Sequence, residues 1–338
     1  MRIGILYNLV DKVDRGKEDD KLADNEVLET AGAVKAALER KGHQVSLVKV
    51  ELDKIKSLKN DYDFIFNLAE GIDNDHFAEP MIAAELRKAR MPFSGADDYA
   101  LALCMNKIKT KRLFQKNNIP TPEYKVFKKP IMRVRKNMGF PLIVKPAYED
   151  GSIGIDLDSI VNDSSQLKKK VNEIIASYKQ PALVERFIDG REVNAGIIGN
   201  KEGAYVLPLS EIMFELPESM PRIVSFSAKW MEDSPQYKGT IGKCPAELPK
   251  HLHEKITEAA KKAFKATGCR DYARVDFRIN EDEVYAIEVN PNPCINPNGA
   301  GFIRSAGVAG YDYDSVINKI VEVAVERHKK KIILKNNC

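Results

Sequence analysis

Residues that build disulfide frameworks and zinc sites are scarce in this sequence of 338 residues. It has five histidines, and its five cysteines contain no C-x-x-C pair; they are Cys104, Cys244, Cys269, Cys294 and Cys338. No histidine stands beside a cysteine at a spacing typical of a metal site. A zinc site is therefore not expected, and a chain of this length buries enough surface to fold without such supports.

Long apolar runs and an excess of one charge are also lacking. No stretch approaches the roughly 20 apolar residues of a membrane span, and the apolar run at residues 3–7 is followed by no small-residue cleavage site. Lys and Arg number 53 against 49 Asp and Glu, a formal net charge of +4. This balance implies neither disorder nor a nucleic-acid surface. We expect a cytoplasmic protein that has neither a membrane nor a nucleic acid as its partner.

The first 100 residues alternate short apolar runs with a helical pattern. Strands are predicted at residues 2–7, 44–50 and 62–67, and a helix at residues 25–40. Asp24 or Asn25 can cap the start of this helix, and Gly42 follows its end. The polar stretch 11–24 is most simply a solvated loop. This order of elements predicts a parallel α/β domain.

The remaining sequence suits two further units, since the length allows two to three domains of roughly 150 residues. A helix at 101–118 ends before two prolines, Pro120 and Pro122, which suggest a domain junction. Strands are predicted at 124–127, 142–145, 183–188, 192–198, 272–279 and 284–289, and helices at 165–177, 249–267 and 313–327. We predict domains at residues 1–104, 105–181 and 182–338.

Two predicted strands near the end carry the strongest chemical signal. Arg274 and Asp276 share one face of the first strand, and Glu288 and Asn290 share one face of the second. If the strands pair, these side chains converge, and Asp276, Glu288 and Asn290 offer the hard oxygen atoms that Mg²⁺ prefers beside a nucleotide phosphate. Surface-facing alternation is the alternative. It is weakened because the intervening residues Val275, Phe277, Ile287 and Val289 provide an apolar face for burial.

Two weaker signals lie in the middle of the chain. Lys145 ends an apolar strand and is followed by the small-residue loop Gly151-Ser152-Ile153-Gly154, which could let backbone N–H groups approach a phosphate. A plain glycine turn is the default alternative, because the loop is neither a Walker P-loop nor a G-x-G-x-x-G turn. The strand Val184-Glu185-Arg186-Phe187-Ile188 could offer backbone hydrogen bonds to adenine, but by composition it is only another strand.

Together, the order and spacing of these segments resemble the ATP-grasp superfamily and, within it, the D-alanine:D-alanine ligase family. The resemblance extends from the first strand to about Tyr311. The matching segments are Met105-Asn106-Lys107, Thr110-Lys111, Ile119-Pro120-Thr121-Pro122, Ile143-Val144-Lys145-Pro146, Gly151-Ser152-Ile153-Gly154, Val184-Glu185-Arg186-Phe187, Ala228-Lys229, Arg274-Val275-Asp276 and Glu288-Val289-Asn290-Pro291. It implies an N-terminal parallel α/β domain followed by a two-subdomain ATP-grasp fold of the α+β type.

The resemblance also implies roles for residues that would contact ATP and its metal ions. Lys107 and Lys145 would hold the α- and β-phosphates, Lys229 the terminal phosphates, and the loop Gly151, Ser152, Ile153 and Gly154 would close over the γ-phosphate. Glu185, Arg186, Phe187 and Ile188 would line the adenine site, and Glu192 would bind ribose. Asp276, Glu288 and Asn290 would hold two Mg²⁺ ions, which Mn²⁺ could replace, and Arg274 would steady an acyl phosphate. Relatives of this type are commonly homodimers.

The acceptor half of the site, meaning the residues that would bind the substrates, differs from the family pattern at several positions. Glu26 matches the family glutamate that binds the first substrate's ammonium, although an exposed helix carboxylate is an equal alternative. Ser152 matches the loop serine, but the family tyrosine that joins this glutamate and serine is replaced by Trp230, which has no hydroxyl. Glu70 replaces a histidine and suggests a more cationic amino group, unless it simply faces water.

The stretch after Asn290 departs as well. Gly299 and Ala300 replace a serine-leucine pair that binds the second substrate's carboxylate, and Asn292 lies in the same altered segment. Losing a hydroxyl that contacts a buried carboxylate would cost about 1.5–3 kcal/mol unless another group replaced it. The nucleotide half of the site is therefore expected to be intact, and the acceptor half changed.

We predict an ATP-dependent carboxylate-amine ligase that joins amino acids or short peptides through an acyl phosphate. Its catalytic candidates are Arg274, Ser152 and Glu26, and its substrate candidates are Glu26, Glu70, Trp230, Asn292, Gly299 and Ala300. Three alternatives stay open: a genuine D-alanine:D-alanine ligase for peptidoglycan precursors, an ATP-grasp kinase that phosphorylates a hydroxyl, and a non-catalytic nucleotide-binding protein.

Overall fold

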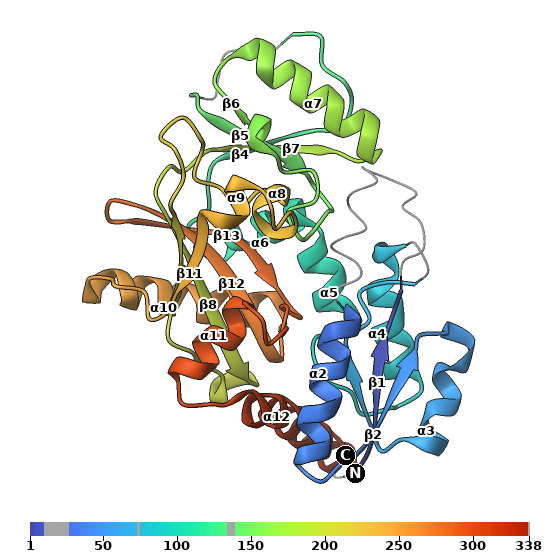
Figure 1. The fold of residues 1–338 in the computed structure, drawn as a ribbon. Helices are drawn as coiled ribbons and strands as arrows, with labels where there is room; N and C mark the ends of the chain where they lie inside the picture. The colour runs from blue at the N-terminus through green and yellow to red at the C-terminus, as the bar shows by residue number, and fades with distance from the viewer. Residues whose placement is uncertain (10–26, 73–74, 134–138, 337–338) are drawn as a thin grey trace.

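Three β-sheets with their covering helices make up the chain in the computed structural model, which describes residues 1–9, 27–72, 75–133 and 139–336. Figure 1 shows the four-stranded sheet at the top, the N-terminal sheet at the lower right and the six-stranded sheet at the left. Among the described residues, no helix is both long enough and apolar enough to cross a membrane. The predicted mixture of a parallel α/β part and an antiparallel α+β part is confirmed.

The N-terminal sheet is parallel and has the strand order β2-β1-β3. Its strands and helices are β1 (Arg2–Tyr7), α2 (Val27–Arg40), β2 (Gln44–Lys49), α3 (Leu58–Asp61), β3 (Phe64–Asn67) and α4 (Glu79–Lys88). Because β1 lies between two strands, its Ile3 and Ile5 are fully buried, and α2 covers them with Ala31 and Val34. The helix α4 was not predicted, and it places Glu79 at its first residue.

Two helices stand where a single helix was predicted at residues 101–118. The helix α5 (Asp98–Met105) ends at Asn106, and α6 (Lys107–Lys116) begins directly after it. The Asn106 side chain accepts a hydrogen bond from the Lys109 backbone N–H, so it caps α6 and breaks the helix. As a result, the Lys107 N–H bonds to the Ala147 carbonyl and the lysine side chain is buried beside the six-stranded sheet.

The four-stranded sheet has the order β4-β7-β5-β6 and is antiparallel. Its elements are β4 (Tyr124–Phe127), β5 (Leu142–Pro146), β6 (Ile160–Val161), α7 (Ser164–Tyr178) and β7 (Ala182–Arg186). The strand β7, which was predicted to open the third unit, instead lies between β4 and β5. A boundary at 181/182 would therefore separate β7 from the two strands to which it is hydrogen-bonded. The sequence did not indicate this pairing, because the partners are distant in the chain.

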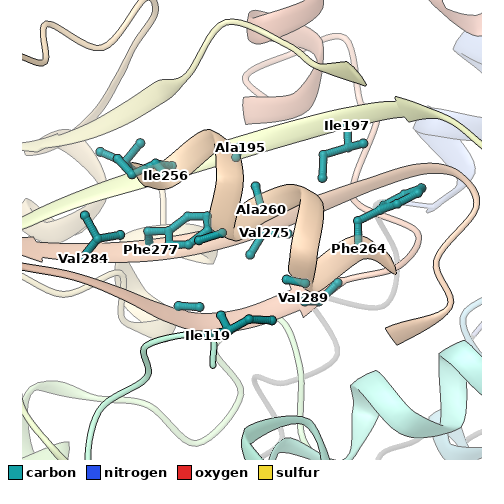
Figure 2. Packing of buried hydrophobic residues seen from close by; sticks show 14 of the residues in the cluster. Ile119, Ala195, Ile197, Ile256, Ala260, Phe264, Val275, Phe277, Val284 and Val289 are labelled. Carbon is teal, nitrogen blue, oxygen red and sulfur yellow. The ribbon is translucent and has the colours of Figure 1, made fainter. Parts of the chain in front are cut away.

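The six-stranded sheet carries the largest core. Its path is β11-β10-β8-β12-β13, with β9 paired to β8. The elements of this part are β8 (Arg191–Gly199), β9 (Tyr205–Val206), β10 (Ser210–Phe214), α8 (Phe226–Trp230), α9 (Pro235–Lys238), β11 (Thr240–Lys243), α10 (Lys250–Thr267), β12 (Asp271–Asn280), β13 (Glu283–Asn290), α11 (Gly301–Val308) and α12 (Tyr313–Asn336). Figure 2 shows Ile256, Ala260 and Phe264 of α10 packed on Val275 and Phe277.

The C-terminal helix α12 joins this sheet to the N-terminal domain. Figure 1 shows α12 running beside α2 near both chain ends, and Arg40 pairs with Asp314 across the two helices. Deeper in the junction, the fully buried Asp271 accepts two hydrogen bonds from Arg327, at 2.9 and 2.8 Å, and one from the Gly95 N–H at 2.9 Å. This junction fixes the start of β12 against the N-terminal domain.

His328, beside this junction, is expected to make the folded state sensitive to acid. Its Nε2 accepts the Phe93 N–H at 3.2 Å, and burial together with Arg327 and Arg270 lowers its pKa to about 4. Below pH 6.5 the unfolded chain binds this proton and the folded chain does not, so stability falls as pH drops from about 6.5 to 4. Over that pH range, we expect the Tm of the wild type to fall about 2–4 °C further than the Tm of His328→Gln. Equal losses, measured by calorimetry, would contradict this assignment.

Candidate active site

Four polar side chains converge on one face of β12 and β13. The strands pair antiparallel, with Arg274 opposite Asn290 and Asp276 opposite Glu288. Val275 and Val289, which point to the other face, lie in the core. The sequence prediction assumed that these two strands pair, and the structure shows that they do. The register shifts after Asp276. Because of this irregularity, Ile287 lines a cavity, although it was expected to be buried with Val289.

Asp276 is the centre of a hydrogen-bond network on this face. Arg274 donates to both of its oxygens, at 2.7 and 2.8 Å. Asn290 donates through Nδ2 to Oδ2 at 2.9 Å, and Asn194 of β8 donates to Oδ1 at 2.8 Å. Asn194 was missed by the sequence prediction, although it lies two residues after Glu192 and therefore on the same face of its strand.

Glu288 faces the buried amino group of Lys107. The two side chains form an ion pair of 3.1 Å, and Lys107 also donates to the Glu149 carbonyl at 2.6 Å. Burial opposes ionisation of Glu288, but Lys107, Lys145 and Arg274 outweigh it and lower the pKa of this carboxyl to about 2. Glu288 is therefore ionised across the physiological range.

Glu185 forms ion pairs with two buried lysines, Lys111 and Lys145. It forms an ion pair with Lys145 at 2.5 Å and a second with Lys111, which is fully buried. Lys111 also donates to the Thr121 hydroxyl at 2.8 Å. Burial lowers the pKa of Lys111, and it lowers that of Lys145 to about 8. The sequence matched Lys111 only as part of a motif, and the structure shows it buried against the carboxylate that holds Lys145.

The loop after β5 is held against the segment that leads into α8. Trp230 Nε1 donates to the Gly151 carbonyl at 2.8 Å, and the Ser152 hydroxyl donates to the Val224 carbonyl at 2.8 Å. Gly151 and Ser152 have φ values of 60° and 65°, in the left-handed region. The Lys229 ammonium lies 4.8 Å from the centre of the Trp230 ring. The ring N–H of Trp230 thus holds the loop in place.

A cavity of about 150 Å³ lies between the four-stranded and six-stranded sheets, and we call it the inter-sheet cavity. Its predicted lining residues are Lys145, Gly151, Ser152, Glu185, Arg186, Phe187, Ile188, Glu192, Lys229, Arg274, Asp276, Glu288 and Asn290. Arg278, which was not predicted, also lines it and contacts Glu192 at 3.0 Å. Although Arg278 is only 6% exposed, its Nη2 has no hydrogen-bond partner within the described parts of the chain. Such an orphaned donor is suited to a polar ligand.

A second cavity, of about 170 Å³, reaches toward the N-terminal domain, and we call it the N-terminal cavity. Glu70, Glu79 and Asp150 line it, together with Trp230 and Asn292. Glu79, Asp150 and Tyr272 were not among the predicted residues, because no local pattern relates them to one another. Five residues line both cavities and mark the place where they meet: Asp150, Gly151, Lys229, Arg274 and Asn290.

The remaining predicted residues lie elsewhere. Ile153 lines the N-terminal cavity, whereas Gly154 packs so closely on Pro146 and Tyr178 that it has no room for a side chain. Gly299 and Ala300 line neither cavity, and the Gly299 carbonyl accepts a hydrogen bond from Arg304. Glu26 lies outside the described residues.

The donor atoms on β12 and β13 fit a hard divalent cation. They comprise two carboxylates and one amide. Within the described residues, no three acidic, histidine or cysteine side chains are grouped as possible metal ligands. Asn290 donates through Nδ2 to Asp276, which leaves its Oδ1 available as a ligand. One or two carboxylates combined with nucleotide phosphates are the usual environment of Mg²⁺. In the structure, the Asp276 oxygens accept four hydrogen bonds, so Arg274 would have to release this carboxylate before it could bind an ion.

Comparison with known proteins gives one consistent result. The family model described as "D-ala D-ala ligase C-terminus" matches residues 113–322. The chain is 32% identical to the uncharacterized protein y4sG of Sinorhizobium fredii, over 88% of each chain. It is 31% identical to the D-alanine–D-alanine ligase of Desulforamulus reducens, over 90% of this chain and 96% of that relative. It is also 31% identical to the corresponding enzyme of Carboxydothermus hydrogenoformans, over 90% and 95%.

A solved structure has the same fold. The crystal structure of D-alanine–D-alanine ligase from Bacillus anthracis complexed with ATP is similar with a TM-score of 0.76 and covers 98% of this chain and 99% of that chain. The two sequences are 22% identical, so this likeness concerns the fold.

Proposed function

The chain belongs to the D-alanine–D-alanine ligase family of ATP-grasp enzymes, and from this premise we propose that it uses ATP to join the carboxylate of an amino acid or short peptide to an amine. It is an ATP-grasp ligase that forms an amide bond. The observation that carries the proposal is the meeting of the two cavities at Arg274, Asn290 and Lys229. A carboxylate bound in one cavity can meet a nucleotide phosphate bound in the other.

ATP occupies the inter-sheet cavity in this proposal. The end of β7 and the residues after it, Arg186 to Ile188, border the adenine, and Glu192 with Arg278 border the ribose. Lys145 lines this cavity and neutralises the α- and β-phosphates, together with Lys107, which does not line the cavity itself but lies 3.1 Å from Glu288. Lys229, which also lines the cavity, binds the terminal phosphates. Positioning and neutralisation of this kind supply most of what phosphoryl transfer requires.

Asp276, Glu288 and Asn290 hold Mg²⁺ in this proposal, because their oxygens share one face beside the phosphate-binding lysines. When bound, the ion neutralises phosphate charge and favours attack at the γ-phosphorus. Arg274 then leaves Asp276 and places its guanidinium against the reacting carboxylate. A planar guanidinium can bind two oxygens at once, which suits both the acyl phosphate and the tetrahedral state that follows.

The reaction proceeds in two steps. A carboxylate oxygen attacks the γ-phosphorus and ADP leaves, which gives an acyl phosphate. The uncharged amine nitrogen then attacks the acyl carbon, and phosphate leaves together with the proton that the nitrogen gives up, which gives the amide. An acyl phosphate hydrolyses when water reaches it. We assign water exclusion to the loop 151–154, because Trp230 and Ser152 hold it over the meeting point of the cavities.

The substrate identity is tested by Mg²⁺-dependent ADP release across single D- and L-amino acids and their pairs, with mass spectrometry of the products. We expect ADP release that depends on an amino acid and yields an amide in equal amount. Formation of D-alanyl-D-alanine alone would identify D-alanine as the substrate despite Trp230, Gly299 and Ala300. A stable phosphorylated hydroxyl as the product would overturn the ligase assignment in favour of a kinase.

A homodimer is also proposed. Three large apolar side chains on the surface of the N-terminal domain, Leu28, Leu47 and Met81, are 40–53% exposed. Leu28 and Leu47 lie on the neighbouring elements α2 and β2, and a contact between two copies would cover both side chains. The mass in solution, measured by light scattering, tests this proposal, and a monomer at micromolar concentration would reject it.

A further inference from the structure

Arg278 is held in a fixed position in the wall of the inter-sheet cavity. Its Nε donates to the Ile188 carbonyl at 3.1 Å, and its Nη1 donates to the Glu192 carboxylate at 3.0 Å. The central carbon of its guanidinium lies 5.5 Å from the centre of the Phe187 ring and 5.9 Å from that of the Phe214 ring. Two hydrogen bonds and two aromatic contacts therefore determine the orientation of the guanidinium plane.

The third nitrogen of this guanidinium, Nη2, is a buried donor without an acceptor. Arg278 is 6% exposed, and Nη2 has no hydrogen-bond partner among the residues that the structure describes. Because Nε and Nη1 are already bound, Nη2 cannot turn toward another acceptor without breaking those contacts. Buried donors are almost always paired. Since Arg278 lines the inter-sheet cavity, its free donor indicates a ligand with an acceptor atom at this position.

Strand β12 sets the place of this donor along the bound nucleotide. Arg274, Asp276 and Arg278 follow one another at every second residue of β12, and all three line the inter-sheet cavity. Two residues of a strand advance by about 7 Å, so Arg278 lies one step beyond Asp276 and two steps beyond Arg274, where the two cavities meet. In the proposed function the terminal phosphates lie at the Arg274 end. The acceptor beside Arg278 therefore belongs to the sugar.

The charges next to this donor favour a neutral group over a phosphate. Glu192 stands opposite Arg278 in the pairing of β8 with β12, and their ion pair has no net charge. Burial raises the pKa of the Glu192 carboxyl, Arg278 opposes this shift, and repulsion from Asp276 and Glu288 adds to it. A further anion beside Glu192 would be repelled in the same way. A hydroxyl suits the pair, because it can accept a hydrogen bond from Arg278 and donate one to Glu192.

The other charged residues that line the inter-sheet cavity have partners of their own or lie elsewhere. Three ion pairs account for most of them: Lys145 with Glu185, Arg274 with Asp276, and Glu288 with Lys107. Asp150 and Lys229 also line the N-terminal cavity and therefore lie where the two cavities meet. Arg186 is exposed, and its guanidinium lies 5.8 Å from the centre of the Tyr285 ring. The buried pair of Arg278 and Glu192 thus determines the chemistry of its own part of the wall.

Resting on the proposed function, we propose that Arg278 and Glu192 together recognise the two adjacent hydroxyls of the ribose, so that the enzyme selects ribonucleotides over deoxyribonucleotides. One hydroxyl accepts the hydrogen bond of Arg278 Nη2, and its neighbour donates to the Glu192 carboxylate. A guanidinium only donates and an ionised carboxylate only accepts, so neither can replace the other. A deoxyribose leaves one of these buried charged groups without its partner, which is how such sites reject an analogue that lacks a hydroxyl.

The test measures nucleotide binding and needs no amino-acid substrate. The Kd values of ATP, 2′-deoxy-ATP and 3′-deoxy-ATP are measured with Mg²⁺ by isothermal titration calorimetry on the full chain. We expect each deoxynucleotide to bind at least about tenfold more weakly than ATP, since a hydrogen bond to a charged group contributes this much or more. This comparison uses the wild-type protein and so does not depend on the folding of any variant.

Variants assign this preference to the pair. Arg278→Lys keeps the positive charge but loses the fixed Nη2 donor, so it should weaken ATP binding and bring the Kd of one deoxynucleotide to within about threefold of that of ATP. Glu192→Gln should do the same for the other deoxynucleotide. Arg191→Lys is the matched control, because Arg191 points to the opposite face of β8, pairs with Glu211 and does not line the inter-sheet cavity. Its Kd ratios should equal those of wild type, and thermal unfolding of each variant verifies the fold.

The outcomes separate the two proposals. If ATP and both deoxynucleotides bind wild type within twofold of one another, or if a folded Arg278→Lys keeps the wild-type ratios, the assignment of Arg278 to the ribose is overturned and the ligase function stands. If Arg278→Lys does not fold, unchanged ratios in Glu192→Gln overturn the pair in the same way. If ATP does not bind at millimolar concentration, both proposals fail.

Discussion

Replacement of Glu288 with glutamine is expected to lower the rate of ATP-dependent amide formation by on the order of 10²–10³. This carboxyl, whose pKa is lowered to about 2, stands opposite Asp276 and against Lys107. Glutamine keeps the shape and one oxygen of the side chain but removes the negative charge that would bind a divalent cation in the proposed site. The initial rate of ADP and amide formation at saturating ATP and Mg²⁺ measures the effect.

Two controls separate this loss from a defect in folding. Glu283→Gln changes an exposed glutamate at the other end of β13 and should keep the wild-type rate. The Mg²⁺ concentration for half-maximal rate should rise in Glu288→Gln, because a metal ligand is weakened while Asp276 and Asn290 stay. Turnover within twofold of wild type at every Mg²⁺ concentration would reject the metal assignment.

Arg274→Lys is expected to lower kcat by on the order of 10² and to uncouple ADP release from amide formation. Arg274 lines both cavities and binds both oxygens of Asp276. Lysine keeps the charge, but it cannot bind two oxygens in one plane, so it cannot hold an acyl phosphate in the same way. More of this intermediate would then react with water, and the amount of amide formed per ADP would fall.

This prediction is measured by quantifying ADP and amide in the same reaction. Arg112→Lys on α6 is the matched control, since Arg112 is exposed and lines neither cavity. A lower kcat with amide and ADP still equal would mean that Arg274 assists phosphoryl transfer but does not protect the intermediate. An unchanged kcat and an unchanged ratio would exclude Arg274 from the reaction.

Local patterns predicted the central part of the candidate site because strand geometry is local. Alternation along a strand places Arg274 with Asp276, and Glu288 with Asn290, whatever the rest of the chain does. The same patterns failed where a distant partner decided the outcome. They divided the chain between Pro181 and Ala182, whereas β7 pairs with β4 and β5. They also predicted one helix where the Asn106 cap makes two.

The carboxylates that line the N-terminal cavity could be predicted only in part. The replacement of a histidine by Glu70 was visible through the family resemblance, and it pointed to a cationic substrate. No sequence pattern indicated Glu79, because its hydrogen-bond partner Asn292 lies 213 residues away and no periodicity connects the two. Asn194 and Asp276 are likewise 82 residues apart and meet only because β8 pairs with β12.

The sequence by itself determined the order of the elements, the polar faces of β12 and β13, and the family to which the chain belongs, since each depends on residues close together or on short motifs in a fixed order. Only the tertiary structure decided which carboxylates line the N-terminal cavity, that Glu185 pairs with both Lys111 and Lys145, and that the shift in register after Asp276 turns Ile287 toward the inter-sheet cavity. The physical reason is that these contacts join segments far apart in the chain, and such contacts are set by the packing of whole sheets and helices.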